Sequence, residues 1–280
     1  MFIAYERNSL DNYRYIRQWI DDLPKRGLSS FSLDDAKLQF PNMPAVNIRN
    51  ALHRLSAAGN VRSVWRGFYA IVLPEYGLEG SVPPVEYIDQ LMIYVGSDYY
   101  VALLSAASYQ GASHQSPQAF QVMSNKQLRP KEASGSRLGF TYKKNLPQSG
   151  IEKKVVRSGC VNVSVPALTA LDLVHYSAKS GGISHVASVL AEFAGSIDFS
   201  AFDADLLKKE PGATIQRLGY LLENSLGEVE LAAALYEKSA EARLRFNRAD
   251  LITGQPGNKS KPAYNNKWKI VINYDVEVSD

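Results

Sequence analysis

Apolar residues recur at helical spacing near the start of the chain. Over residues 9–23 the apolar residues on one helical face are Leu10, Tyr13, Ile16, Ile20 and Leu23. Ser9 is placed as the N-cap of this helix. This spacing predicts a first amphipathic helix. The sequence SLDD at residues 32–35 then has the pattern of a capping box, in which Ser32 and Asp35 satisfy each other's backbone donors. It predicts a short second helix that ends near Phe40.

A third helix, over residues 45–58, has the most regular pattern in the chain. Its apolar positions recur three and four residues apart, at Ile48, Ala51, Leu52 and Leu55, and Gly59 is placed to end it. The preceding PNMP, residues 41–44, must be a turn because its prolines lack amide donors and disfavour helix before them. The other face of this helix carries groups that bond phosphates and base edges: Asn47, Arg49, Asn50, His53 and Arg54.

After Gly59 the period changes from helical to alternating. Two strands are predicted, at 60–65 and 68–73, joined by a two-residue Arg66-Gly67 turn. Three helices followed by a β-hairpin is the order of a winged helix-turn-helix, which we assign to residues 1–75. Trp65 is expected to pack the hairpin against the helices.

In that geometry the third helix enters the major groove of DNA, where arginine and asparagine bind guanine and adenine edges. Two hairpin arginines would reach phosphates or the adjacent minor groove. The predicted DNA-binding residues are Asn47, Arg49, Asn50, His53, Arg54, Arg62 and Arg66. A module that binds protein through the same elements is the alternative.

Proline and glycine mark residues 76–84 as a linker to a larger domain over residues 85–280. Its helices are predicted at 86–95, 99–109, 166–178, 183–193, 203–209, 213–224 and 228–237. Its strands are predicted at 119–123, 137–144, 155–165 and 267–277. The fold class is therefore α+β, an N-terminal winged helix-turn-helix followed by a larger mixed α/β domain.

Composition limits the chemistry of the chain. Cys160 is its one cysteine, so an internal disulfide is ruled out, and four histidines are too scattered for a structural zinc site. Charged residues interrupt the N-terminus where a signal peptide needs an apolar stretch, and no run approaches the roughly 20 apolar residues of a membrane span. We expect a cytoplasmic protein with no cofactor, no metal and no membrane partner.

Charge is distributed unevenly although the net charge is only +3. Between residues 118 and 160, nine basic residues face two acidic ones, a local net charge of +7. An anionic partner is one interpretation of this stretch, and an exposed, solvated pair of strands is the other. On strand 137–144 the basic residues alternate with apolar ones, which predicts one buried and one basic face. The predicted secondary basic surface comprises Lys126, Arg129, Lys131, Arg137, Lys143 and Lys144, and the same lysines would also protect an exposed sheet edge.

Enzymatic function rests on weaker patterns. Thr169 and Asp172 lie three apart on one predicted helix, a spacing more typical of a buried hydrogen bond than of catalysis. In GSIDFSAFDADL, residues 195–206, Asp203 and Asp205 have the spacing by which nucleotidyltransferases hold metal ions, but they also suit a helix start. We therefore predict no catalytic residues. A metal-dependent nucleotidyltransferase or nuclease-like enzyme, or a protein-interaction adaptor, is the alternative function.

Four sequence segments together resemble the AbiEi family, the antitoxins of type IV abortive-infection toxin-antitoxin systems of bacteria. They are LSAAGNVRSVWRGFYAIVLPEY (55–76), YYVALLSAASYQGASHQSPQAFQVM (99–123), VSVPALTALDLV (163–174) and QRLGYLLE (216–223). The resemblance implies an N-terminal winged helix that binds double-stranded DNA at inverted repeats in its own promoter and represses the operon. It also implies a C-terminal domain that counters a nucleotidyltransferase toxin without forming a stable complex, in defence against phage.

Overall fold

The computed structural model describes residues 13–77, 81–112, 117–133, 135–200, 202–254 and 262–278. The chain folds into two compact units that alternate along the sequence. Unit 1 comprises Met1–Asp98, Lys126–Phe140 and Lys154–Val161, and unit 2 comprises Tyr99–Asn125, Thr141–Lys153 and Asn162–Asp280. Residues 85–98, assigned by sequence to the second domain, thus group with the N-terminal elements. Helices and strands are both abundant, and the fold class is α+β as predicted.

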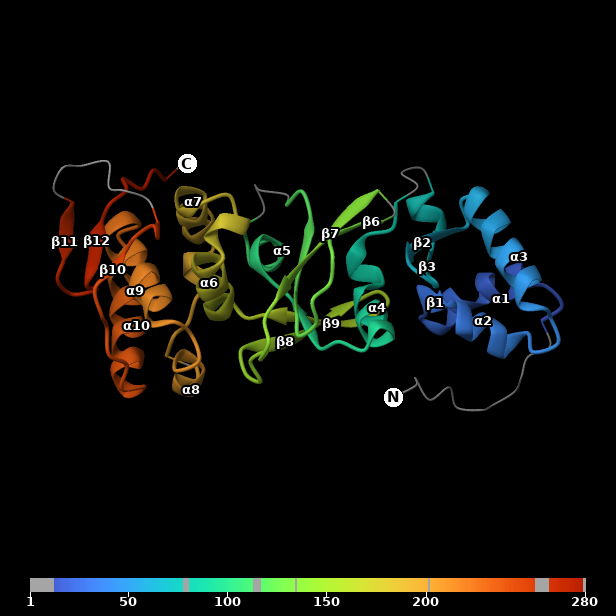
Figure 1. Cartoon of the computed structure of the whole chain (residues 1–280), viewed down its shortest axis with the longest axis horizontal. Helices are drawn as coiled ribbons and strands as arrows, with labels where there is room; N and C mark the ends of the chain where they lie inside the picture. The colour runs from blue at the N-terminus through green and yellow to red at the C-terminus, as the bar shows by residue number, and fades with distance from the viewer. Residues whose placement is uncertain are drawn as a thin grey trace. The chain divides into compact units, whose positions relative to one another are not determined.

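The N-terminal part of unit 1 has three helices and a three-stranded sheet (Figure 1). The helices are α1 (Ile16–Asp22), α2 (Leu33–Gln39) and α3 (Ala45–Ala57). The strands are β1 (Ser30–Ser32), β2 (Val61–Trp65) and β3 (Phe68–Ile71), in the antiparallel order β1-β3-β2. Sequence periodicity did not predict β1, which is only three residues long. We call residues 13–73 the winged-helix segment, after the fold that the sequence predicts for it.

The first helix is shorter than predicted. Within the described residues it begins at Ile16 rather than at residue 9, and Ser9 and Leu10 lie outside them. Tyr13 is not helical, and its hydroxyl donates a hydrogen bond of 2.5 Å to Asp22. The ring of Tyr13 fits the apolar spacing of a helix, but the residue lies before the helix and its side chain bonds Asp22 within it. A 3-10 turn, Leu23–Arg26, continues from the end of α1.

Helix α4 and a hairpin complete the regular structure of unit 1. Helix α4 (Ile88–Val95) follows short 3-10 turns at Pro74–Tyr76 and Pro84–Glu86. The hairpin pairs β6 (Lys131–Ala133) with β7 (Ser136–Tyr142), whose last two residues belong to unit 2. Strand β6 lies against β2 of the winged-helix segment.

Unit 2 has a helical core built largely from long apolar runs. Its helices are α5 (Leu103–Ser108), α6 (Pro166–His175), α7 (Ile183–Phe193), α8 (Ala204–Leu207), α9 (Gly212–Tyr220) and α10 (Val229–Glu241). Short 3-10 turns stand at Ser177–Lys179 and Ala194–Ser196, and a π-helical turn, Leu221–Ser225, continues α9. Helix α6 is buried along most of its length, with Leu168 and Leu171 fully enclosed.

A six-stranded sheet has the order β6-β7-β5-β4-β9-β8. Its remaining strands are β4 (Tyr99–Val101), β5 (Phe120–Ser124), β8 (Ile151–Val156) and β9 (Gly159–Ser164). The predicted helix at 99–109 is wrong in its first part, which is strand β4. All three residues of β4 are buried between β5 and β9, and a strand covered on both faces has the same continuous apolar pattern as a buried helix.

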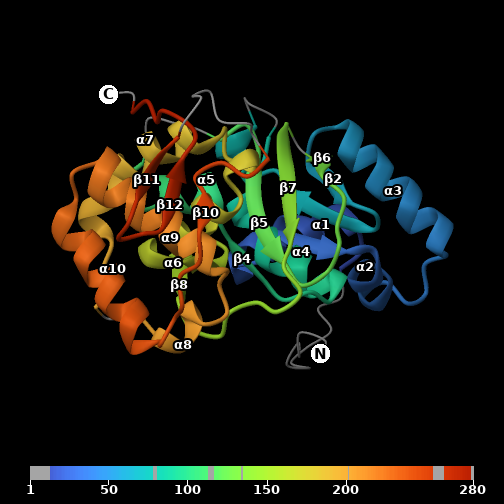
Figure 2. The same ribbon diagram turned by 60° about the vertical axis from the view of Figure 1, so that its left-hand side comes forward.

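The predicted single strand at 155–165 is also wrong, because the chain turns at Arg157 and Ser158 between β8 and β9. Gly159 follows the turn at a φ of 126°, a conformation that residues with a side chain rarely adopt. The predicted strand at 267–277 is reduced to β12 (Ile270–Ile272). It pairs with β10 (Ala249–Asp250) and β11 (Ala263–Asn265) in a small sheet beside α9 and α10 (Figure 2).

Candidate nucleic-acid interface

Local interactions fix both ends of α3. Pro44 precedes its first turn, and the Pro44 carbonyl accepts from the amides of Asn47 and Ile48. At the other end Gly59 has a φ of 78°, its amide bonds the Ser56 carbonyl, and the Asn60 amide bonds the Leu55 carbonyl. This pair of bonds is a Schellman motif, which glycine favours because it has no Cβ to clash. The sequence prediction of a helix at 45–58 ended by Gly59 is confirmed.

The inner face of α3 is held by an apolar core. Ile48 and Leu52 are buried, and they belong to the same core cluster as Ile16, Trp19 and Ile20 of α1. Trp19 also makes edge-on contacts with two phenylalanine rings of the segment. These contacts determine which face of α3 is buried, so its other face points away from the core.

That other face carries the predicted polar residues. All five are exposed: Asn47, Arg49, Asn50, His53 and Arg54. Helix α3 contains no acidic residue, so nothing on the helix neutralises its two arginines. The structure thus brings together amide and guanidinium groups on one solvent-facing surface, the chemistry that base edges and phosphates require.

The β2–β3 hairpin lies directly after α3 and carries the other two predicted residues. Arg66 is exposed at the turn. Arg62 is partly buried and donates a 3.3 Å hydrogen bond to the Ser56 carbonyl near the end of α3. The backbone of the turn is held in place, because the Tyr94 hydroxyl donates to the Arg66 carbonyl at 3.0 Å and the Leu33 amide donates to the Gly67 carbonyl at 2.8 Å.

Trp65 packs differently from the expectation. Its ring makes an edge-on contact with Phe140 of β7, with centroids 6.0 Å apart. The hairpin is therefore supported by β7 as well as by its own sheet. A ring contact 75 residues away in sequence has no signal in the local pattern, so sequence alone pointed to the nearer helices.

Five of the six residues predicted as a secondary basic surface are exposed: Lys126, Arg129, Lys131, Arg137 and Lys144. Two of the five already have partners. Lys126 donates to the Val95 carbonyl at 2.8 Å, and Arg137 lies 3.6 Å from a carboxylate oxygen of Glu132. Arg129 and Lys131 belong to unit 1, as does the winged-helix segment.

The prediction for Lys143 is wrong. Its side chain is only 16% exposed, and its ammonium lies 2.7 Å from Glu210 and 3.3 Å from Asp172. The alternation on this strand also shifts, because Leu138 and Thr141, three residues apart, are both buried while Tyr142 is exposed. The strand therefore has no continuous basic face.

Unit 2 contains a buried ionic cluster, which consists of Lys143, Asp172, Glu210 and Tyr100. The Tyr100 hydroxyl donates to Asp172 at 2.8 Å. Burial raises the pKa of Asp172 to about 6, against the opposing effect of the Lys143 ammonium. For Lys143, burial alone would lower the pKa, but the two carboxylates outweigh it and the pKa is raised.

The pattern at Thr169 and Asp172 has a structural explanation. Thr169 is fully buried, and its hydroxyl lies 2.7 Å from that of Ser164 and donates to the Val165 carbonyl at 3.1 Å. Gln110 donates to the same hydroxyl at 2.9 Å. Both side chains of the pair are thus engaged in internal hydrogen bonds, as expected for this spacing.

No group of three or more histidine, cysteine, aspartate or glutamate side chains converges on a metal position among the described residues. Asp203 is exposed and accepts a 3.1 Å hydrogen bond from Ser149, while the side chain of Asp205 lies outside the described residues. Among the described residues no helix combines the length and apolar character needed to cross a membrane.

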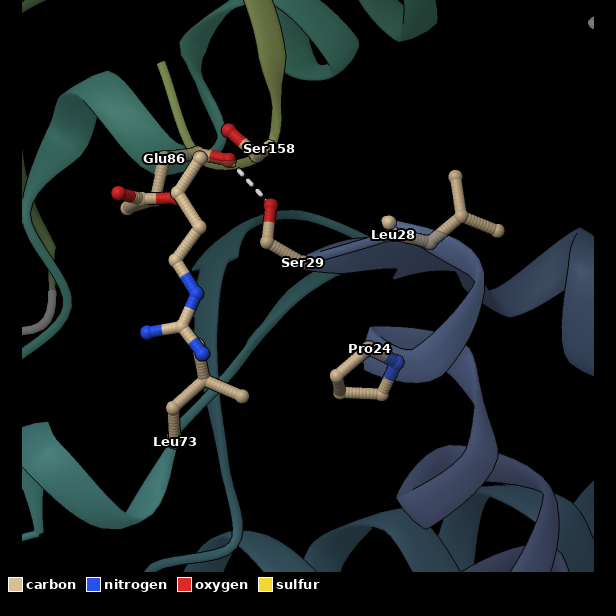
Figure 3. A pocket seen from close by; sticks show the side chains of 8 residues that line it. Pro24, Leu28, Ser29, Leu73, Glu86 and Ser158 are labelled. Atoms are coloured by element: carbon tan, nitrogen blue, oxygen red, sulfur yellow. Dashed lines mark hydrogen bonds between the residues drawn. The ribbon is translucent and has the colours of Figure 1, made fainter.

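Unit 1 also has a small pocket beside the residues that precede β1 (Figure 3). Its volume of about 20 Å³ is enough for about one water molecule and far too small for a nucleotide. The residues that line it are Pro24, Gly27, Leu28, Ser29, Leu73, Glu86, Arg157 and Ser158. The Ser29 hydroxyl donates to the Glu86 carbonyl, and Arg157 forms an ion pair with Glu75, so these polar groups serve the fold.

Comparison with known proteins gives a family for part of the chain. Residues 100–224 match the model of the AbiEi antitoxin C-terminal domain. All four residues of the buried ionic cluster lie within this match. No curated protein matches the chain.

A crystal structure of the RV2827C protein from Mycobacterium tuberculosis has a similar fold, with a TM-score of 0.62 at 13% sequence identity. The similarity covers 91% of this chain and 90% of that one. At this identity the comparison concerns the fold alone. The antitoxin assignment comes from the family match: residues 100–224 are similar to the AbiEi antitoxin C-terminal domain, and this match supports an antitoxin role in a toxin-antitoxin system.

Proposed function

We propose that the chain is a DNA-binding autorepressor and the antitoxin of a type IV system that counters a nucleotidyltransferase toxin. The observation that carries the DNA-binding half is the outward face of α3, on which Arg49, Asn50 and their three polar neighbours are all exposed. The family match over residues 100–224 supports the antitoxin half.

The proposed geometry follows from general features of DNA. The major groove admits one α-helix, and an asparagine or arginine there can bond adenine or guanine with two hydrogen bonds. Helix α3 presents such groups at its surface, and Arg66 at the hairpin turn is free of the core. Arg62 is the weaker candidate of the two hairpin arginines, because it already bonds the Ser56 carbonyl.

The DNA-binding half is tested with a double variant, Arg49→Ala with Asn50→Ala. Both side chains are exposed, so the fold should persist while binding to a duplex from upstream of the chain's own gene is lost. Loss of the Asn50 base contact, worth about 1–3 kcal/mol, together with the contact made by Arg49, lowers the affinity by at least tenfold. An electrophoretic mobility shift measures this, with circular dichroism to verify folding.

The matched control is Arg245→Ala, which removes the same net charge from an exposed position in unit 2. It should leave the mobility shift unchanged. If the double variant shifts the duplex as well as the original protein does, the proposed role of α3 is refuted.

The antitoxin half is tested by co-expression with the toxin encoded by the neighbouring reading frame. We expect the chain to restore growth, and the Arg49, Asn50 double variant to do so equally well, because the antitoxin domain lies at residues 100–224. In a type IV system the two purified proteins should not co-elute in size-exclusion chromatography. Co-elution as one complex, or a neighbouring frame without nucleotidyltransferase activity, would contradict this half of the proposal.

A further inference from the structure

The burial of α3 defines the line on its surface that points farthest from the core. Consecutive helical residues are rotated by about 100°, and the packed face consists of the buried Ile48 and Leu52 with the partly buried Ala51 and Leu55. The line opposite this face passes close to Val46, Asn50 and His53. All three are exposed, and Val46 is 52% exposed although it is apolar. Together they form a ridge that begins in the first turn of the helix.

The two arginines flank this ridge on opposite sides. By the same rotation, Arg49 lies to one side of the line and Arg54 to the other, next to Asn47. A duplex groove has phosphates along both edges and base edges along its floor. The central ridge therefore faces the floor while a cation faces each rim, an arrangement of charge that suits duplex DNA.

Val46 gives this ridge a specific chemistry. The apolar group that the floor of the major groove displays is the C5 methyl of thymine, and apolar side chains contact it. Asn50 stands four residues further along, a rise of about 6 Å, and asparagine bonds adenine through N6 and N7. Successive base pairs are about 3.4 Å apart, so the two residues reach base pairs no more than about two steps apart.

We propose that Val46 and Asn50 together read a thymine and an adenine within two base-pair steps, so that this protein selects A·T pairs opposite the N-terminal half of α3. The inference rests on the proposed DNA binding and adds the base composition of the recognised site. It makes Val46 a specificity-determining residue.

The test uses the full chain and begins by selecting its preferred duplexes from a randomised library. In the selected duplex each thymine is then replaced singly by uracil, which keeps the base pair but lacks the methyl group. At one thymine the affinity of the original protein should fall by about fourfold, the equivalent of one buried methyl-sized group. Replacing each adenine within two base-pair steps of that thymine singly by 7-deazaadenine should, at one adenine, lower the affinity by about fivefold or more.

Variants assign each effect to its residue. In Val46→Ala the affinity should no longer respond to the thymine-to-uracil change, and in Asn50→Ala it should no longer respond to 7-deazaadenine. Leu38→Ala is the control: Leu38 is an apolar residue of α2 that is 69% exposed, and its loss should leave both responses intact.

The outcomes separate the two proposals. If no duplex is enriched or bound above background, the proposed function fails. If a duplex is bound but no thymine responds to uracil, or the response persists in Val46→Ala, DNA binding stands and the reading by Val46 is overturned.

Discussion

Lys143 illustrates how far a single residue can depart from its sequence pattern. It lies near the end of the predicted alternating basic strand 137–144, yet its ammonium contacts carboxylates 29 and 67 residues away in sequence. A buried charge is tolerated only when it is paired, and here the pairing is supplied by Asp172 and Glu210. No local window contains both partners, so the pattern could only indicate a surface lysine.

The cluster makes stability depend on pH through Asp172. Its pKa is about 6 in the folded protein against 3.8 ordinarily, so folding favours the protonated acid. That stabilisation is fully present below pH 3.8 and is lost as the pH rises through 6. We expect the free energy of unfolding of the original protein, relative to that of Asp172→Asn, to fall between these two pH values.

Urea unfolding of both proteins at closely spaced pH values measures this difference. The amide of Asp172→Asn still accepts the bond from Tyr100 but cannot ionise. Asp203→Asn, the same change at an exposed position of unit 2, should show no such fall. A difference that increases with pH over this window would contradict the expectation.

Among helices and strands, the best-predicted features are those fixed by neighbours in sequence. The capping box at Ser32 is present, with the Asp35 amide bonded to the Ser32 hydroxyl at 3.0 Å and the Ser32 amide bonded to Asp35 at 2.7 Å. Packing between elements depends on distant residues instead. Gly219 of α9 is an example, since a Cβ there would lie 2.2 Å from the buried ring of Trp268.

Gly219→Ala should therefore destabilise the protein. Helix propensity alone would favour alanine by about 1 kcal/mol, but overpacking costs about 1–3 kcal/mol, and the enclosed Trp268 ring has little room to move. Thermal unfolding should show a lower Tm. In the control, Gly212→Ala of the same helix, the new Cβ meets only ordinary contacts at 3.9 Å, so the Tm should hold or rise. A higher Tm for Gly219→Ala would contradict this expectation and show that helix propensity outweighs overpacking at this position.

Over the whole chain, each unit is built from segments that are separated in sequence. Basic residues that are close in sequence can therefore belong to different units. The basic stretch is shared between two units: Arg129 and Lys131 belong to unit 1 and Lys144 to unit 2. Strand β6, which carries Lys131, lies against β2 of the winged-helix segment. If α3 binds DNA as proposed, the exposed cations near β6 are thus the ones placed to extend that contact.

Replacing Arg129 and Lys131 together by alanine should weaken DNA binding in a salt-dependent way. Each lost phosphate contact makes the slope of log affinity against log salt shallower by about 0.9, so we expect a change of about 1 to 2. Titrations at several salt concentrations measure the slope. Lys208→Ala with Lys209→Ala, an exposed pair in the acidic part of unit 2, serves as control and should not alter it. An unchanged slope in the first pair would remove these residues from the interface.

The amino-acid sequence was sufficient for α3, its boundaries and its exposed polar face. Capping, the glycine C-terminus and the spacing of Ile48 and Leu52 act within a few residues, so they leave a readable local pattern. It was also sufficient for the α+β class and for the four segments that resemble the AbiEi family. These features depend on interactions between near neighbours or on motifs that are themselves short.

Only the tertiary structure decided where β4 lies, what Trp65 packs against and that Lys143 is buried with Asp172. In each case the determining partner is remote in sequence: a paired strand, the Phe140 ring or a carboxylate of helix α6. The free energy of such contacts is gained only when distant segments meet, so a local apolar or charged pattern is compatible with several outcomes until the chain has folded.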